Sequence, residues 1–159
     1  MFTENLLFYK EESLIMAFID TIKERAKADK KTIVLPESME KRTYEAAEKI
    51  LKEGIANLVI IGTPEEIEKY GKGYDISGAT IVDPFNDPNK QKYIDKFVEL
   101  RSKKGVTPEM AKEQMEKDYM YYACLMCKCG DADGAVSGAC HSTGNTIRPA
   151  LQLLKTKPG

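Results

Sequence analysis

The stretch TIVLPESMEKRTYEAAEKILKEGIANLVII, residues 32–61, decides the fold class of this protein. It begins with a short apolar run over 32–35 and ends with a second apolar run over 57–61. Between the runs, apolar residues recur at helical spacing from 46 to 51, and Gly54 follows as a helix terminator. Short apolar runs joined by a helix predict two buried parallel strands linked by a crossover helix.

The alternation of strands and helices continues along the rest of the chain. It predicts an α/β fold with a parallel or mixed sheet, helices on both faces and three α/β/α layers. Ser38 is the expected cap of the helix after the first strand, and Thr63, with Pro64 and Glu66 behind it, predicts a capping box. The other predicted elements are helices over 18–28, 90–104, from 107 onward, over 118–128 and up to 154, and strands over 80–82 and 134–137.

The length and charge of the chain limit what it can be. Its 159 residues suit one domain with a substantial core. Its 24 basic and 25 acidic residues give a net charge of −1, which predicts neither nucleic-acid binding nor binding to a membrane surface. No apolar run approaches the roughly 20 residues of a membrane-spanning helix.

The first residues of the chain differ from the remainder. We expect residues 1–15 to be an N-terminal extension and the folded domain to begin at Met16, where a helical pattern starts. The extension carries three glutamates and lacks the basic start and small-residue cleavage site of a secretory signal. The four cysteines show no disulfide framework, so we expect a cytoplasmic protein with reduced thiols.

A loop of small and hydroxylated residues follows the last predicted strand, over 138–145. Loops at the carboxyl ends of strands bind ligands in α/β sheets, and free N–H groups at the start of a helix attract anions. With Thr146 as the helix cap, Arg148 lies in the first helical turn and could bind the same anion. The loop therefore predicts a phosphate-type site, and a capped helix with a surface arginine is the equally open alternative.

The same segment resembles the phosphate acetyl/butyryl transferase family, in which a strand ending in Ser-Gly precedes a histidine, hydroxyl residues and Thr-x-Arg-Pro. Here the pattern reads Ser137-Gly138, His141, Ser142-Thr143 and residues 146–149. The resemblance covers about residues 16–159, and the acetyl-transferring branch is the more similar. The other segments that resemble the family are, in order, 33–37 with Arg42, 54–56, 60–62, 81–84, 99–101 and 131–134.

The resemblance implies an activity and a larger fold. The activity is reversible transfer of an acetyl group between acetyl phosphate and coenzyme A, with phosphate as a product and no bound cofactor or metal. The fold is isocitrate/isopropylmalate-dehydrogenase-like, with two domains around a cleft, in a homodimer. Residues 16–159 then correspond to the first α/β domain, truncated before the second, and the catalytic base is expected in the C-terminal part. A phosphate butyryltransferase and a non-catalytic phosphate-binding fragment are the alternatives.

The resemblance also implies roles for individual residues. Arg148 and Arg101 match family arginines that neutralise phosphate oxygens of acetyl phosphate or coenzyme A. From the residues alone, Arg101 is better explained as a helix C-terminal cation that complements the helix dipole, and the resemblance reverses that preference. The remaining residues expected at the substrate or phosphate site are Ser142, Thr143, Thr146 and His141, the last as a residue that orients the loop.

The cysteines raise the alternative of a metal site. Cys124, Cys127 and Cys129 are close in sequence, and Cys140 and His141 lie further along the chain. Structural zinc usually takes paired ligand knuckles separated by a long spacer, which this spacing lacks. Ordinary core thiols on an apolar helix are therefore expected, and no metal site is predicted.

Overall fold

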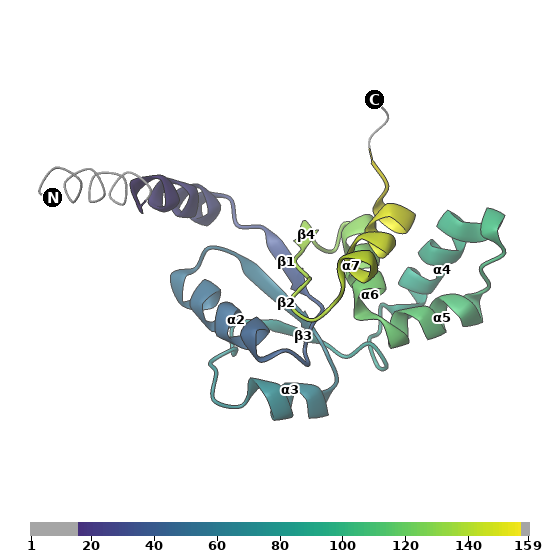
Figure 1. Ribbon diagram of the computed structural model, residues 1–159, viewed down its shortest axis with the longest axis horizontal. Coiled ribbons are helices and arrows are strands. Elements are labelled where there is room, and N and C mark those ends of the chain that lie inside the picture. The colour runs from purple at the N-terminus through teal and green to yellow at the C-terminus, as the bar shows by residue number, and fades with distance from the viewer. Residues whose placement is uncertain (1–15, 157–159) are drawn as a thin grey trace, which may run out of the picture.

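The structure, a computed structural model, describes residues 16–156. Its centre is a sheet in which the strands lie in the order β3-β2-β1-β4 and all three pairings are parallel (Figure 1). The predicted parallel α/β fold is therefore confirmed. The strands are β1 (Thr32–Leu35), β2 (Asn57–Ile61), β3 (Thr80–Val82) and β4 (Gly134–Ala135). The helices are one over residues 16–28, α2 (Lys41–Glu53), α3 (Pro64–Gly71), α4 (Lys90–Arg101), α5 (Pro108–Lys117), α6 (Tyr119–Cys129) and α7 (Thr143–Pro149), with a 3₁₀ turn η1 (Ser102–Lys104) and a π-helical turn η2 (Ala150–Leu154).

Helices cover both faces of the sheet because successive strand residues point in opposite directions. On one face, Leu35, Leu58 and Ile60 pack with Tyr44 and Ala47 of α2. The neighbouring strand residues point to the other face, into a larger core that they form with α4, α5 and α6. Figure 1 shows this division, with α2 and α3 on one side of the sheet and α4 to α7 gathered on the other.

The larger core surrounds α6. Every residue of this helix from Tyr119 to Met126 is buried, as its nearly uniform apolar pattern predicts. The Tyr122 hydroxyl donates a hydrogen bond to the carboxylate of Asp87, and its ring meets that of Tyr93 edge-on, with 5.1 Å between the centroids. Because α6 also contacts α7 and β4, it sets the positions of the segments on either side of the predicted functional loop.

The predicted helix caps have mixed outcomes. Thr63 forms the capping box with Glu66 as predicted. The prediction for Ser38 is wrong, because α2 begins only at Lys41 and Glu40 is its cap. Ser38 is instead buried in the turn before α2 and donates a hydrogen bond to the Glu66 carboxylate (2.9 Å). A hydroxyl that is free to cap a helix is equally free to bond a side chain of another element, so its partner depends on packing.

Two predictions about the limits of the domain have no test here. The proposed extension, residues 1–15, lies outside the described residues. The isocitrate/isopropylmalate-dehydrogenase-like label stays a prediction, because it concerns a second domain as well as this one. In the part of the chain that the structure describes, no helix is both long enough and apolar enough to cross a bilayer.

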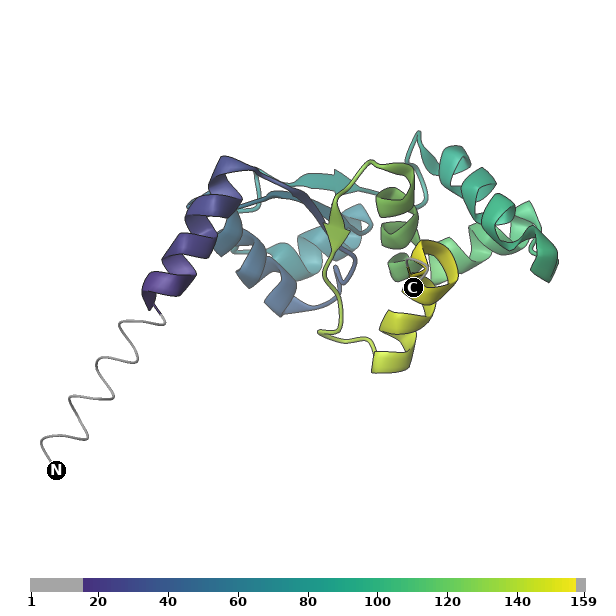
Figure 2. The ribbon, with the colours of Figure 1, turned by 90° about the horizontal axis from the view of Figure 1, so that it is seen from above.

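Helix 16–28 projects away from the other elements (Figures 1 and 2). Its apolar side chains are largely exposed: Phe18 at 66%, Ile22 at 48% and Ile19 at 38% of full accessibility. An ion pair of 2.7 Å links Lys23 to Glu53 of α2. An apolar helix face of this kind favours association with another apolar surface.

We therefore expect the purified chain to associate through this helix. Changing Ile19 and Ile22 together to lysine places two charges on the apolar face and should shift the sedimentation coefficient toward that of a monomer. The control is Glu24→Gln, which alters an exposed polar position of the same helix and should leave the distribution unchanged. A wild-type chain that sediments as a single monomeric species would contradict the expectation.

Candidate functional site

The predicted functional loop lies beside the end of β1. β4 pairs with β1 in parallel, with Val34 opposite Ala135. The carboxyl ends of parallel strands share one edge of the sheet, so the residues after these two strands meet. β4 ends earlier than the predicted 134–137, and the Val136 amide makes one further bond, to the Val34 carbonyl oxygen (3.0 Å). The chain then leaves the sheet and enters the loop.

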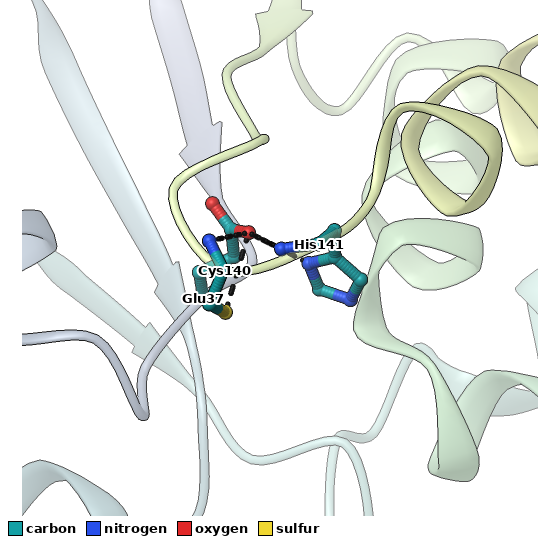
Figure 3. Close-up of side chains that lie close together, drawn as sticks. All are labelled: Glu37, Cys140 and His141. Atoms are coloured by element: carbon teal, nitrogen blue, oxygen red, sulfur yellow. Dashed lines mark hydrogen bonds and ion pairs between the residues drawn. The ribbon is translucent and has the colours of Figure 1, made fainter.

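Glu37, two residues after β1, is the centre of the site (Figure 3). It is only 3% exposed. One of its carboxylate oxygens accepts the amides of Gly138 (3.0 Å) and Ala139 (2.9 Å), and the other accepts those of Cys140 and His141 (2.9 Å each). The second oxygen also accepts the Cys140 thiol (3.3 Å) and lies 2.7 Å from His141 Nδ1. Donors from four consecutive residues, the 138–141 loop, therefore enclose one buried carboxylate.

These hydrogen bonds determine the charges in the site. Burial raises the pKa of Glu37, but the amides of Cys140 and Ala139 and the imidazole and amide of His141 outweigh it and hold the pKa at about 2. Glu37 is therefore ionised at neutral pH. Burial and the bond to Glu37 raise the pKa of the Cys140 thiol to about 11, so Cys140 is a hydrogen-bond donor and not a thiolate nucleophile.

His141 lies between two carboxylates. Its Nδ1 is 2.7 Å from Glu37 Oε1, and its Nε2 is 3.5 Å from Asp118 Oδ1. An ionised carboxylate can only accept hydrogen bonds, so Nδ1 carries the proton that bonds Glu37. Asp118 caps α6 by accepting the Met120 amide (3.0 Å). His141 thus links the end of β1 to the start of α6.

The helix after the loop begins earlier than predicted. α7 starts at Thr143, and its cap is Ser142, whose hydroxyl accepts the Asn145 amide (3.3 Å). Thr146, the predicted cap, lies inside the helix and donates its hydroxyl to the Ser142 carbonyl oxygen (3.2 Å). Serine and threonine are both good caps, and only the path of the loop decides between them. Arg148 consequently lies in the last turn of α7, and the prediction that it lies in the first turn is wrong.

The two predicted arginines come from different helices. Arg101 is the last residue of α4 and is half-buried, whereas Arg148 on α7 is exposed. Burial and the charge of Asp118 raise the pKa of Tyr121, and the positive charges of both arginines act to lower it. Both guanidinium groups are thus within electrostatic range of the Tyr121 hydroxyl. Within residues 16–156 neither group forms a hydrogen bond or ion pair, so both charges are available to an anionic ligand.

Glu37, Cys140 and His141 also bring three ligand-type atoms within 4.8 Å of one another. A metal ion at this point would need lone pairs of Glu37 that already accept hydrogen bonds. It would also need a thiolate from a thiol whose pKa is raised. The group is therefore better suited to holding the loop than to holding a cation. The three cysteines of α6 are free thiols, and burial raises the pKa of each.

Comparison with known proteins identifies the family to which this fold belongs. Residues 17–159 match a family model described as phosphate acetyl/butaryl transferase. The chain is 51% identical over 144 residues to the phosphate acetyltransferase of Thermoanaerobacterium thermosaccharolyticum. The chain belongs to the phosphate acetyl/butaryl transferase family. The resemblance seen in the sequence is therefore confirmed.

The match to this family covers most of the chain but less than half of its relatives. A second relative, the phosphate acetyltransferase of Clostridium acetobutylicum, is 46% identical. In this match and in the match to the Thermoanaerobacterium protein, the aligned region covers 91% of this chain and 44% of the relative. A crystal structure of a phosphotransacetylase from Streptococcus pyogenes matches with a TM-score of 0.83 at 36% identity, over 91% of this chain and 44% of that one. The chain thus spans less than half the length of these family members.

Sequence reasoning missed three residues of the site. The loop amides that Glu37 binds are 101 to 104 residues away, so no local pattern connects them to it. Its place just after a buried strand, at the ligand-binding edge, was the signal that could have found it. Asp118 and Tyr121 carried no such signal, because a helix-capping aspartate and a core tyrosine are ordinary features.

Proposed function

We propose that the chain is the first α/β domain of a phosphate acetyltransferase, which transfers an acetyl group reversibly between acetyl phosphate and coenzyme A. The observation that carries this proposal is the 51% identity, across 91% of the chain, to a relative named phosphate acetyltransferase. Coenzyme A is a substrate, and no bound cofactor is needed. The whole enzyme acts in the cytoplasm as a homodimer, and binds neither nucleic acid nor membrane.

The proposed contribution of this domain is to bind phosphate. Arg148 and Arg101 supply the positive charge. Both charges act on Tyr121, and within residues 16–156 neither guanidinium group has a hydrogen-bond or ion-pair partner, which supports this assignment. The hydroxyls of Ser142 and Thr143, at the start of α7, supply donors, whereas the Thr146 hydroxyl already donates its proton to the Ser142 carbonyl oxygen and would have to release that bond to bind phosphate. His141 orients the loop that leads into this helix. The cations stabilise the phosphate group as it leaves the acetyl carbon.

The chemistry also needs groups that we do not assign to this domain. Attack of the coenzyme A thiol on the acetyl carbonyl requires a base for the thiol proton and donors for the developing oxyanion. The family resemblance puts both in the C-terminal part of the family fold. His141 is engaged with Glu37 and faces Asp118, which supports a structural role for it rather than a role as base.

The test is a chimera in which residues 16–159 replace the matching segment of the Thermoanaerobacterium enzyme. With acetyl phosphate and coenzyme A, thioester absorbance should report turnover. Arg148→Ala should lower kcat/KM for acetyl phosphate by about 10²-fold or more, because a cation aimed at the developing charge is lost. Lys103→Ala, an exposed cation beside Arg101, is the matched control and should have no effect. Equal turnover in both variants would contradict the assignment of Arg148.

Two alternatives have distinct outcomes in the same assay. Preference for butyryl phosphate over acetyl phosphate would indicate a phosphate butyryltransferase. The second alternative is a phosphate-binding fragment without turnover. Phosphate binding by the chain, combined with an inactive chimera, would support that alternative.

A further inference from the structure

The 138–141 loop presents its amides to an anion, but that anion is part of the protein. The carboxylate of Glu37 accepts hydrogen bonds from the amides of all four residues. A buried charge is costly unless it is paired or fully hydrogen-bonded, and here the loop backbone supplies the compensation. Amides occupied in this way are not free for a substrate phosphate, which must use the donors after the loop.

The path of the loop depends on these bonds. Gly138 has a φ of +112°, a conformation that L side chains rarely adopt, so the chain turns sharply as the loop begins. A further anchor of the loop is the bond from Arg42 to the Ala139 carbonyl oxygen (2.6 Å). Without the carboxylate, four amides in an irregular segment would lose their acceptor at once. The loop would then be held between β4 and α7 mainly by the bond from Arg42.

The loop in turn sets the position of α7. Ser142, the cap of that helix, comes directly after the last residue bound to Glu37. The same carboxylate holds His141 by its Nδ1, which directs Nε2 toward Asp118 of α6. Glu37 therefore determines three things together: the loop path, the tautomer of His141 and the point at which α7 begins.

We propose that Glu37 is a positioning residue of the phosphate site, where its carboxylate takes the place of an anion among the loop amides and so fixes the start of α7. It touches neither the arginines nor the hydroxyls that would hold phosphate; it acts through the loop. The part that concerns phosphate rests on the proposed function. The part that concerns the loop and His141 does not.

The single histidine of the chain makes the proposal directly measurable. Long-range ¹H–¹⁵N NMR spectra of the full chain report which ring nitrogen of His141 carries the proton in the neutral ring. The wild-type chain should show the Nδ1–H tautomer, because Glu37 accepts that proton. Glu37→Gln, which removes the charge at nearly constant shape, should shift the ring toward the Nε2–H tautomer, and Glu37→Asp should restore Nδ1–H in part. The matched control is Glu45→Gln, an exposed carboxylate of α2 that pairs with Lys49 and has no link to the loop.

Titration of the same samples with inorganic phosphate separates the two proposals. Glu37→Gln should weaken phosphate binding at least about tenfold through displacement of α7, while Glu45→Gln should leave it unchanged. A wild-type Nδ1–H tautomer without phosphate binding would support the positioning of the loop and contradict the proposed function. Wild-type His141 in the Nε2–H form, or equal phosphate affinity in Glu37→Gln and the wild type, would overturn the inference. The tautomer of wild-type His141 is measured without any variant, so a variant that fails to fold does not remove the test.

Discussion

Gly62→Ala is expected to destabilise the fold by about 3 kcal/mol, the upper end of the usual cost of overpacking a core. A β-carbon at this position would lie 2.4 Å from the β-carbon of Ser38 and 2.5 Å from its hydroxyl oxygen. Carbon atoms in contact normally stay about 3.5–4.0 Å apart. Ser38 has no exposed surface and is held by its hydrogen bond to Glu66, so it cannot move aside without breaking that bond.

Thermal unfolding measures this effect. For a chain of this size, a loss of about 3 kcal/mol corresponds to a fall in Tm of roughly 6–12 °C. The matched control is Gly144→Ala, where an added β-carbon meets no heavy atom within 4 Å. A second arm is the pair Ser38→Gly with Gly62→Ala, which removes the clashing atoms and should be more stable than the sum of the single changes predicts. Equal Tm values for Gly62→Ala and Gly144→Ala would show that the turn before α2 yields easily.

Loss of the charge on Glu37 is expected to lower the free energy of unfolding by a similar amount, and the size of this effect should depend on pH. The pKa of Glu37 is about 2 in the folded protein, against an ordinary value of 4.5. A group with a depressed pKa in the folded state contributes stability above its unfolded pKa and loses that contribution as pH falls. The contribution should therefore be complete above pH 4.5 and disappear between pH 4.5 and 2, and it amounts to about 3 kcal/mol.

Urea unfolding as a function of pH measures this contribution. Glu37→Gln should unfold at a lower urea concentration than the wild type at pH 7, and the difference should shrink as pH falls from 4.5 toward 2. Glu45→Gln is the control, because Glu45 forms an exposed pair with Lys49 and such pairs contribute little. A difference between wild type and Glu37→Gln that stays constant over this pH range would mean that the charge is not the stabilising feature.

Part of this structure could be predicted because its causes are local. The apolar runs of β1 and β2, the helical spacing between them and the terminating Gly54 lie within thirty successive residues, 32–61. The capping box of Thr63 and Glu66 involves residues only three positions apart. In such cases the periodicity and the cap residues are themselves the physical causes of the element. The family pattern of the loop was likewise readable as a contiguous segment.

Other features could not be predicted because several residues were equally suited to one role. Ser142 and Thr146 are both competent caps, and the structure selects Ser142 because the loop delivers the chain to α7 at that point. The same ambiguity misplaced the cap of α2, where Ser38 bonds Glu66 instead. The choice of cap sets the helical position of every later residue in the helix, which is why Arg148 lies in the last turn of α7 and not in the first.

By itself, the sequence determined the alternation of strands and helices, the parallel sheet and the family, since all three depend on patterns within short segments. Only the tertiary structure decided that Glu37 binds the 138–141 loop and that the charges of Arg101 and Arg148 act on one tyrosine of α6. It also decided that the apolar face of helix 16–28 stays exposed. The physical reason is the parallel pairing of β1 with β4, which brings together residues about one hundred positions apart that no local pattern connects.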